Sequence, residues 1–419
     1  MVYPRQRLYD INHSGYFNAF VSRSINSGKD ASFAEAFSKF VDASYPVLPL
    51  SRGRLSLYFA TRNRVSGNRR DVVMCPFTIF DMINMILCGG GRPKFIDSDP
   101  GTPHVSLETI RQQVDENTAM VVITHYHTVN PEIEKIASYL RSRGIALFED
   151  CAISLGGRVN GKHVGSFGDY ALFSFGLFKF ISTYFGGGAL VRDETEREAI
   201  ATEISGWPRM NAKDLWPYVK KGLKFSTLTS RPVFNLLTFP LFRFGYVNDV
   251  DFIKKNAVND PDPHRKSELP ESYKRRPSSF QTSEWVRQLT QVENARQARL
   301  DNATLYATRF TGSNVIRNAS MVDRKADCYL NYPVNVDGSV EVLKQLMTSG
   351  YDASTYFYRN CAELECFDEF HVELPNIDAY ARDMIILPTY PGLPADYIRG
   401  LSDEIIRIAS EMASSSADI

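Results

Sequence analysis

At 419 residues the chain is longer than one hydrophobic core usually serves, so two domains are expected. Lys plus Arg equals Asp plus Glu at 48 each, and this zero formal net charge argues against a global attraction to nucleic acid. No run of about 18 apolar residues exists, so no membrane-spanning helix is expected. The N-terminus lacks the apolar core of a signal peptide, and the six cysteines lack zinc-finger spacing. We therefore predict a cytoplasmic protein with unpaired thiols and no metal site.

The first half of the chain predicts alternating strands and helices. Residues 1–50 are expected to be irregular or lightly helical. Short apolar runs that end in polar or turn residues are predicted strands, at 71–75, 94–97, 119–124 and 146–150. Between the last two, residues 132–143 place apolar side chains at helical spacing. The alternation predicts an α/β fold whose mostly parallel sheet is covered on both faces.

Polar residues follow several of these strands. In parallel sheets, ligands bind beyond the carboxyl ends of the strands. Asp97, His125 and Asp150 each lie at or just after such an end. By contrast, residues 89–91 form a glycine run that lacks the spacing of a nucleotide-binding loop, so a turn is predicted there.

Residues 197–276 differ in character from the alternating region and are predicted to be an insertion that forms a lid or a subunit interface. Within it, residues 232–246 interleave Phe, Leu and Pro and lie next to Arg231 and include Arg243. Aromatic residues with basic flanks also suit a membrane surface or a lipid-linked substrate, so peripheral membrane contact through 232–246 stays open. The polar residues 259–266 are predicted to be an exposed loop.

The C-terminal part predicts a smaller α+β domain. Its expected elements are one long helix, two strands and a final helix, at 281–311, 328–333, 383–388 and about 395–412. We therefore divide the chain into a large domain over 1–276 and a small domain over 277–419.

The block 149–188 carries the residues best suited to chemistry. Asp150 ends a buried strand, where an acid could hold a protonated ring nitrogen. Lys179 follows apolar residues such as Phe175 and Phe178, and desolvation would make its amine a better nucleophile toward an aldehyde. From residue types alone, a capping Asp150 and a surface Lys179 whose stem covers apolar groups remain the alternative.

Four linked motifs favour the first interpretation. They read Glu-Asp-x-Ala, then Gly-Lys-x-Val-Gly-Ser-x-Gly-Asp, then Ser-Phe-x-x-x-Lys, then three glycines, at 149–152, 161–169, 174–179 and 186–188. In this order and spacing the chain resembles the DegT/DnrJ/EryC1/StrS family of aminotransferases, which use pyridoxal 5′-phosphate (PLP) and have the aspartate aminotransferase (fold type I) architecture. The resemblance is good over about 45–195 and looser over 277–310 and 387–393.

The resemblance implies roles for individual residues. Lys179 would form the Schiff base with the cofactor, and Asp150 would pair with the pyridinium nitrogen and keep it protonated. Ser174 would bind the cofactor phosphate. His125 matches a histidine that lies near the ring in the family, although a hydrogen-bonded structural histidine is an equal alternative.

The phosphate cup is expected earlier in the chain. Residues 51–57 precede an amphipathic segment, where free backbone N–H groups and the helix dipole would favour an anion. By resemblance the cup is formed by four residues in a row: Gly53, Arg54, Leu55 and Ser56. Arg54 replaces the family's Thr or Ser and could add a charge-assisted contact. The alternative is an ordinary helix start.

Other positions depart from the family pattern. The aromatic segment at 75–80 is one residue short, which leaves Phe77 and Phe80 as candidates to stack on the ring. Ile153 replaces a glutamine that contacts the cofactor side. Ser279 begins the segment that carries Asn and Arg in the family, where it reaches the cofactor of a neighbouring subunit.

These correspondences imply a PLP-dependent aminotransferase that moves an amino group, by family analogy from glutamate, to a keto-sugar that is often nucleotide-linked. Such enzymes serve surface polysaccharide or natural-product biosynthesis and are usually homodimers with shared active sites. The alternatives are another PLP reaction on the same scaffold, such as elimination or decarboxylation, and a non-catalytic regulatory relative.

Overall fold

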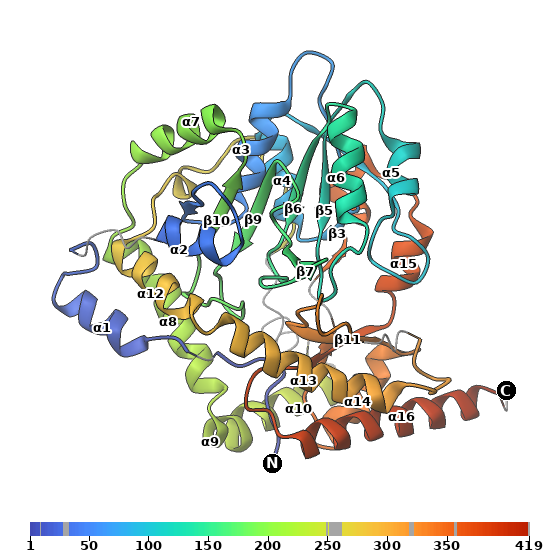
Figure 1. Cartoon of the computed structure of the whole chain (residues 1–419). Coiled ribbons are helices and arrows are strands. Elements are labelled where there is room, and N and C mark those ends of the chain that lie inside the picture. Colours follow the sequence, from blue (N-terminus) through green and yellow to red (C-terminus); the bar gives the residue numbers. More distant parts are fainter. Residues whose placement is uncertain are drawn as a thin grey trace.

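A seven-stranded sheet forms the centre of the larger part of the molecule (Figure 1). The computed structural model describes residues 1–8, 10–27, 33–248, 250, 262–317, 322–355 and 358–417. In spatial order the strands are β1 (Leu48–Leu50), β10 (Gly187–Val191), β9 (Tyr170–Ser174), β6 (Ala146–Asp150), β5 (Thr118–Thr124), β2 (Asp71–Met74) and β4 (Arg92–Phe95). The run from β9 to β4 is parallel, whereas β10 is antiparallel to both of its neighbours. The predicted mostly parallel sheet is confirmed.

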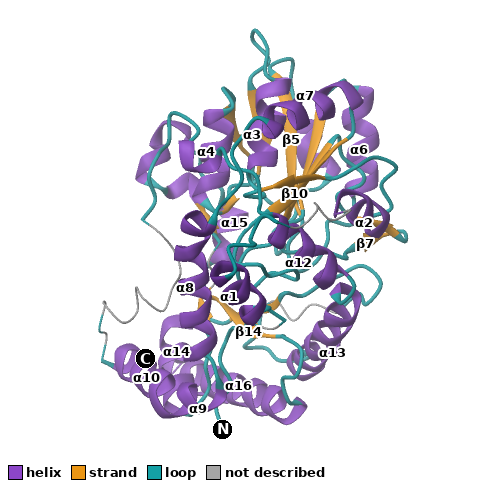
Figure 2. Cartoon of the chain, turned by 90° about the vertical axis from the view of Figure 1, so that its left-hand side faces the viewer, coloured by secondary structure: helices purple, strands orange, loops and turns teal. Residues whose placement is uncertain are grey.

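Helices cover both faces of this sheet. Figure 2 shows α3 and α4 on one side of the strands and α6 on the other. The helices around the sheet are α3 (Leu55–Arg64), α4 (Phe80–Cys88), α5 (Leu107–Gln113), α6 (Ile133–Ser142) and α7 (Glu194–Ser205). Helix α6 buries Ile133, Ile136 and Leu140, the apolar positions whose spacing predicted it. The predicted turn at residues 89–91 directly follows α4, and Gly90 has a positive φ of 84° that suits glycine.

A smaller α+β part packs against this body, as predicted. Its antiparallel sheet has β14 (Met384–Pro388) between β11 (Asn331–Asn335) and β12 (Ser354–Thr355). Its main helices are α13 (Val292–Phe310), α14 (Ser339–Thr348) and α16 (Ala395–Ala417). They surround a second hydrophobic core, separate from the core of the larger sheet. The division of the chain at residue 276 stays a prediction.

The remaining elements connect or flank these two parts. Those before and within the insertion are α1 (His13–Val21), α2 (Phe33–Phe40), α8 (Ala212–Leu228), α9 (Arg231–Val233), the π-helical turn η1 (Phe234–Thr238), α10 (Phe239–Val247) and η2 (Glu271–Tyr273). The others are β3 (Phe77–Thr78), β7 (Arg158–Val159), β8 (Lys162–His163), α12 (Ser279–Leu289), β13 (Arg359–Asn360), η3 (Cys361–Glu363), η4 (Glu365–Phe370) and α15 (Pro375–Ala381). In the part of the chain that the structure describes, no helix is long and apolar enough to cross a bilayer. Of the predicted loop at 259–266, residues 259–261 lie outside the described residues.

The prediction of one helix over 281–311 is wrong. The chain instead forms α12 and α13, with a break at Thr290 and Gln291. Helix α12 packs in the larger core, where Trp285 is fully buried, whereas α13 runs from Val292 in the larger core to Leu300 in the smaller one. The apolar periodicity continues through this break, which is why the spacing alone predicted one helix.

Trp285 is expected to be a main support of this packing. Its ring contacts Phe33 and Phe175, and its indole N–H donates to Thr183. Replacing it with Ala should reduce the free energy of unfolding by about 3–5 kcal/mol through the cavity that remains. Urea unfolding measures the effect. Trp216→Ala is the control, because Trp216 is 45% exposed and its loss should cost about 0.5 kcal/mol or less. Equal losses in the two variants would contradict the assignment.

Candidate active site

The carboxyl ends of β6 and β9 lie side by side, because these two strands pair in parallel. Asp150 is the last residue of β6, and Ser174 is the last residue of β9. Lys179 comes five residues after Ser174, and all three line one cavity of about 130 Å³ together with Gly53 and Arg54. The sequence prediction that an acid at 150 and an amine at 179 meet is therefore matched by the geometry.

The segment that carries Lys179 connects β9 to the antiparallel β10 and reverses the direction of the chain. Phe178, directly before the lysine, has a φ of 63°, and Tyr184 has a φ of 70°. Such left-handed conformations are unfavourable for aromatic residues and persist where surrounding contacts impose them. Gly186 closes the turn with a φ of 128°, where a side chain would also collide with the ring of Trp285. The backbone here is shaped to bring Lys179 back to the sheet edge.

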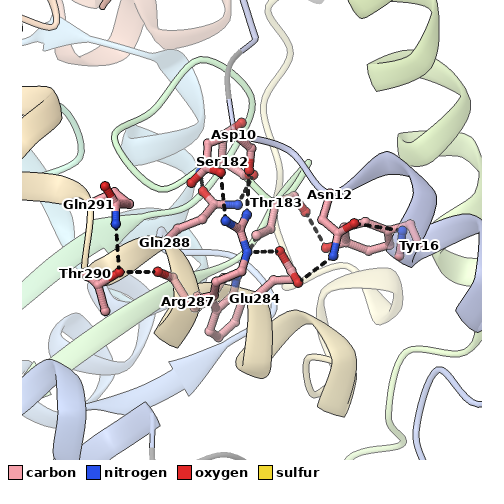
Figure 3. A network of polar contacts seen from close by, with 12 residues as sticks. Asp10, Asn12, Tyr16, Ser182, Thr183, Glu284, Arg287, Gln288, Thr290 and Gln291 are labelled. Atoms are coloured by element: carbon pink, nitrogen blue, oxygen red, sulfur yellow. Dashed lines mark hydrogen bonds and ion pairs between the residues drawn. The ribbon is translucent and has the colours of Figure 1, made fainter.

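Helix α12 holds the far half of this turn (Figure 3). The amide of Gln288 accepts from the backbone N–H of Ser182 at 2.7 Å and donates to the carbonyl of Ser182 at 3.0 Å. Trp285 donates to the hydroxyl of Thr183, and Gln281 donates to the carbonyl of Phe185. These four hydrogen bonds fix three residues of the turn, which lie three to six positions beyond Lys179.

Burial sets the charge state of the two central groups. It lowers the pKa of Lys179 to about 8, and the charge of Asp150 opposes this shift whereas that of Arg54 adds to it. Burial also raises the pKa of Asp150, although the N–H of Ala152, at 2.9 Å, and the charge of Lys179 favour its carboxylate. A cation placed beside Asp150 would stabilise the ionised form further.

A larger cavity of about 630 Å³ adjoins the first, and Arg54, Ile79 and Lys179 line both. Its wall comes from both parts of the molecule, since Asn331 and Ser354 belong to the small sheet. Besides Lys179, three cationic side chains line it: Arg5, Arg54 and Lys266. The cavity is therefore suited to a large anionic ligand.

An ionic cluster organises one wall of this larger cavity. Asp81 pairs with both Arg54 and Lys266, and Tyr273 donates to its carboxylate at 2.8 Å. Burial opposes ionisation of Asp81, but these two cations hold the pKa of its carboxyl well below its usual range. One acid thus faces two cations, which leaves positive charge at the cavity wall.

The predicted phosphate cup is placed at the smaller cavity in part. Gly53 and Arg54 line it, whereas Leu55 and Ser56 are buried behind it in the first turn of α3. The Ser56 hydroxyl donates to the carbonyl of Ala171. A Cβ on Gly53 would lie 2.6 Å from the carbonyl oxygen of Phe173, so glycine is required for this close approach to β9. The cofactor-binding role of these residues stays a prediction.

The two predicted aromatic candidates have different positions. Phe80 lines the larger cavity. Phe77 is buried against Tyr126 and Tyr358 and does not line either cavity. Tyr358, which sequence reasoning missed, lines the smaller cavity instead. It precedes β13, whose Arg359 pairs with Thr78 of β3, 281 residues earlier in the chain, so no local motif could have revealed it.

Two further predicted residues lie outside the cavity linings. His125 is fully buried: its Nδ1 accepts from the N–H of Asn130, so its Nε2 carries the proton and donates to Glu149 at 3.1 Å. These contacts favour the structural alternative for His125. Ser279 begins α12, where its N–H donates to Asn26. Within this chain it does not reach the cavity that contains Lys179.

The side chains of His125, Glu149 and Cys151 are close enough to suggest a metal site, but their surroundings argue against one. The carboxylate of Glu149 accepts from the N–H groups of Gly165, Phe167 and Gly168 in addition to His125. Burial raises the pKa of the Cys151 thiol far above neutrality. The Glu149 carboxylate is thus already committed to hydrogen bonds that join β6 to the loop before β9.

Three cavity residues outside the recognised motifs were also missed. Lys266 and Tyr273 belong to the insertion, and Arg5 to the N-terminal segment. Arg5 is held by Asp352, whose carboxylate accepts from its backbone N–H and its Nε, each at 2.7 Å. In the sequence, each of these three is only a basic or aromatic residue in a segment without a regular pattern. Such residues are too common for any one of them to be singled out.

The comparisons with known proteins agree with this geometry. The model of the DegT/DnrJ/EryC1/StrS aminotransferase family matches residues 18–222 and 254–405, so the chain belongs to this family. GDP-perosamine synthase from Escherichia coli O157:H7 is 32% identical over 146 residues, which are 35% of this chain and 40% of that protein. A dTDP-4-dehydro-2,3,6-trideoxy-D-glucose 4-aminotransferase from Saccharopolyspora spinosa is 32% identical over 141 residues, 34% and 37% of the two chains. The matched segment thus spans less than half of either relative.

Solved structures show the same fold over nearly the whole chain. PseC of Helicobacter pylori, described as an aminotransferase involved in the biosynthesis of pseudoaminic acid, aligns with a TM-score of 0.72 and 17% identity over 97% of this chain and 98% of its own. An aminotransferase from Psychrobacter cryohalolentis aligns with a TM-score of 0.74 and 16% identity over 97% and 98%. The chain therefore has the architecture of fold type I PLP-dependent transferases.

The lowered pKa of Lys179 predicts unusual reactivity toward amine reagents. In protein freed of any bound aldehyde, labelling of Lys179 should reach half of its maximal rate near pH 8, because the neutral amine becomes the main form there. A lysine in a model peptide, with a pKa of about 10.4, is the reference. Mass spectrometry after short labelling at several pH values gives the profile. Asp150→Asn should move the midpoint to lower pH, since the carboxylate raises this pKa; a midpoint near that of the peptide would contradict the site.

Proposed function

We propose that the chain is a PLP-dependent aminotransferase that transfers an amino group, from glutamate as donor, to a nucleotide-linked keto-sugar. The observation that carries this proposal is the meeting of Asp150 and Lys179 in one cavity. Membership of the family supports the reaction class. By family analogy the enzyme would act in the cytoplasm as a homodimer.

The residues of the smaller cavity fit PLP by their chemistry. A desolvated amine, Lys179, would bind the aldehyde, and a buried acid, Asp150, would face the ring nitrogen. Ser174 and Gly53 line the same cavity, with Arg54 as the cation for a phosphate. Tyr358 and Ala152 line it as well and would contact the ring.

Each group would have a defined task. When bound, PLP would supply an electron sink for the negative charge that develops on the substrate carbon. Lys179 would take the proton from that carbon and return it to the cofactor side, and its pKa of about 8 suits both directions near neutral pH. Asp150 would keep the ring nitrogen protonated. The fixed turn from 175 to 186 would hold the Lys179 amine in place during the transfer.

The larger cavity supports an acceptor that carries phosphate. Arg5, Arg54 and Lys266 give it a positive wall beside Lys179, and its volume of about 630 Å³ exceeds what a simple amino acid needs. Relatives similar to this chain are named for GDP- and dTDP-linked sugars. A nucleotide-linked keto-sugar, used in surface polysaccharide or natural-product biosynthesis, combines these features.

Removal of the lysine amine tests the reaction. Lys179→Ala should lower kcat by at least about 10²- to 10⁴-fold, because the group that moves the proton is lost. The assay follows 2-oxoglutarate formed from glutamate with a panel of GDP-, dTDP- and UDP-linked keto-sugars. Lys135→Ala, on the exposed side of α6, is the matched control and should keep full activity. A wild-type protein that aminates no member of the panel and produces no 2-oxoglutarate would contradict the proposal.

The positive wall predicts a separate effect on the acceptor. Lys266→Ala should raise the KM for the nucleotide-linked acceptor roughly tenfold, as expected for the loss of one charge-assisted contact, and leave the half-reaction with glutamate nearly unchanged. Lys274→Ala is the control from the same segment, because Lys274 pairs with Glu271 and lies outside the cavity lining. Steady-state kinetics with each substrate varied in turn separates the two half-reactions. Equal losses with glutamate and with the acceptor would argue against phosphate recognition by Lys266.

A further inference from the structure

The insertion presents an apolar stripe that the proposed reaction does not use. Residues 231–247 form one continuous helical rod of α9, η1 and α10, which Figure 1 shows at the edge of the molecule near the N-terminus. Its outward face consists of exposed apolar side chains at helical spacing: Leu236, Leu237, Pro240, Leu241, Phe244 and Val247. Leu236 is 83% and Phe244 is 57% exposed. Apolar faces of this kind mark interaction surfaces.

The inward face of the same rod is firmly attached. Phe234 and Phe239 are buried together with Met347 of α14. The side chain of Asn235 accepts from the N–H of Val2 at 2.8 Å and donates to its carbonyl at 3.0 Å. The outward stripe is therefore held in position by a packed face behind it, and it is additional to the residues that the core uses.

The charge along the chain from 215 to 248, which includes the rod and most of α8, is of one sign. From 215 to 248 the chain contains no Asp or Glu but five basic residues, so this stretch has a formal charge of +5 in a chain whose total is zero. The basic residues, all exposed, are Lys220, Lys221 and Lys224 on α8 and Arg231 and Arg243 on the rod. A second protein would have to desolvate these cations at the rim of an apolar contact, whereas anionic lipid headgroups neutralise them in place.

We propose that the rod of residues 231–247 lies in the headgroup region of an anionic lipid bilayer, with Leu237, Leu241 and Phe244 inserted and the basic residues of α8 facing the headgroups. The shape agrees with this position. The prolines at 232 and 240 and the π-helical turn do not interrupt the rod. In-plane amphipathic helices need an apolar face and basic flanks and do not need to span the bilayer.

The docked rod is also connected to the larger cavity. The hydroxyl of Tyr246, on α10, accepts from Arg5 at 3.1 Å, and Arg5 lines that cavity. Phe225, near the end of α8, lines it too. Lipid docking would thus bring the acceptor cavity of the proposed function close to the bilayer surface.

Flotation with vesicles tests the proposal on the full-length protein. Vesicles of phosphatidylcholine alone are compared with vesicles that also contain phosphatidylglycerol. Wild-type protein should float with the anionic vesicles and much less with the neutral ones, and high salt should weaken the binding. Leu241→Glu combined with Phe244→Glu should lower the partition coefficient at least about tenfold. Lys221→Glu combined with Lys224→Glu should lower it for anionic vesicles only.

The matched control is Val372→Glu, since Val372 is an exposed apolar residue outside the insertion and its change should leave flotation intact. Because both positions of the double variant are exposed, its melting temperature should stay near that of the wild type. Wild-type protein that stays with the soluble fraction in both vesicle types would overturn the proposal. So would a self-association in the absence of lipid that the double variant abolishes, because the stripe would then cover a second copy of the chain.

Discussion

The arrangement of the site depends on one constraint, the parallel pairing of β6 with β9. It places the carboxyl ends of two strands at the same sheet edge, where Asp150 pairs with Leu172 and Ser174 follows two residues later, so that both line one cavity although they are 24 residues apart. Lys179 then has to be returned to that edge by a tight turn, and the left-handed Phe178 and the contacts from α12 accomplish this. The pKa shifts of Asp150 and Lys179 follow, because the edge is covered and little water reaches it.

The second face of β6 explains why the motif around Asp150 extends to residue 169. Successive side chains of a strand point to opposite faces, so Glu149 points away from Asp150. A buried carboxylate is costly unless it is hydrogen-bonded, and Glu149 accepts from three backbone N–H groups of the 165–168 loop. The loop can approach so closely because Gly165 has a φ of 90° and because a Cβ on Gly168 would lie 2.8 Å from the carbonyl of Leu147. The acid and the glycines are thus one structural device that fixes the end of β6.

Much of this could be predicted from the sequence, for reasons that differ between elements. The strands at 119–124 and 146–150 are short apolar runs bounded by polar residues, so the local sequence is enough to predict them. The motifs that resemble the family located Asp150 and Lys179. The break between α12 and α13 was not predictable, because the apolar spacing of Trp285, Leu289 and Val292 continues through it. Tyr358 and Lys266 reach the cavities through long-range packing, which leaves no trace in the neighbouring residues.

The insertion connects the two proposals physically. Arg5 donates to Tyr246 of α10 and is paired with Asp352 of the small domain, so a single guanidinium joins the rod, the N-terminal segment and the cavity wall. Burial opposes the charge of Arg5, but Asp352 and Tyr246 raise its pKa and keep it cationic. A cation fixed in this way does not need to be ordered when an anionic acceptor binds, so less conformational entropy is lost. The element that we assign to the lipid surface would therefore also preorganise one wall of the acceptor cavity.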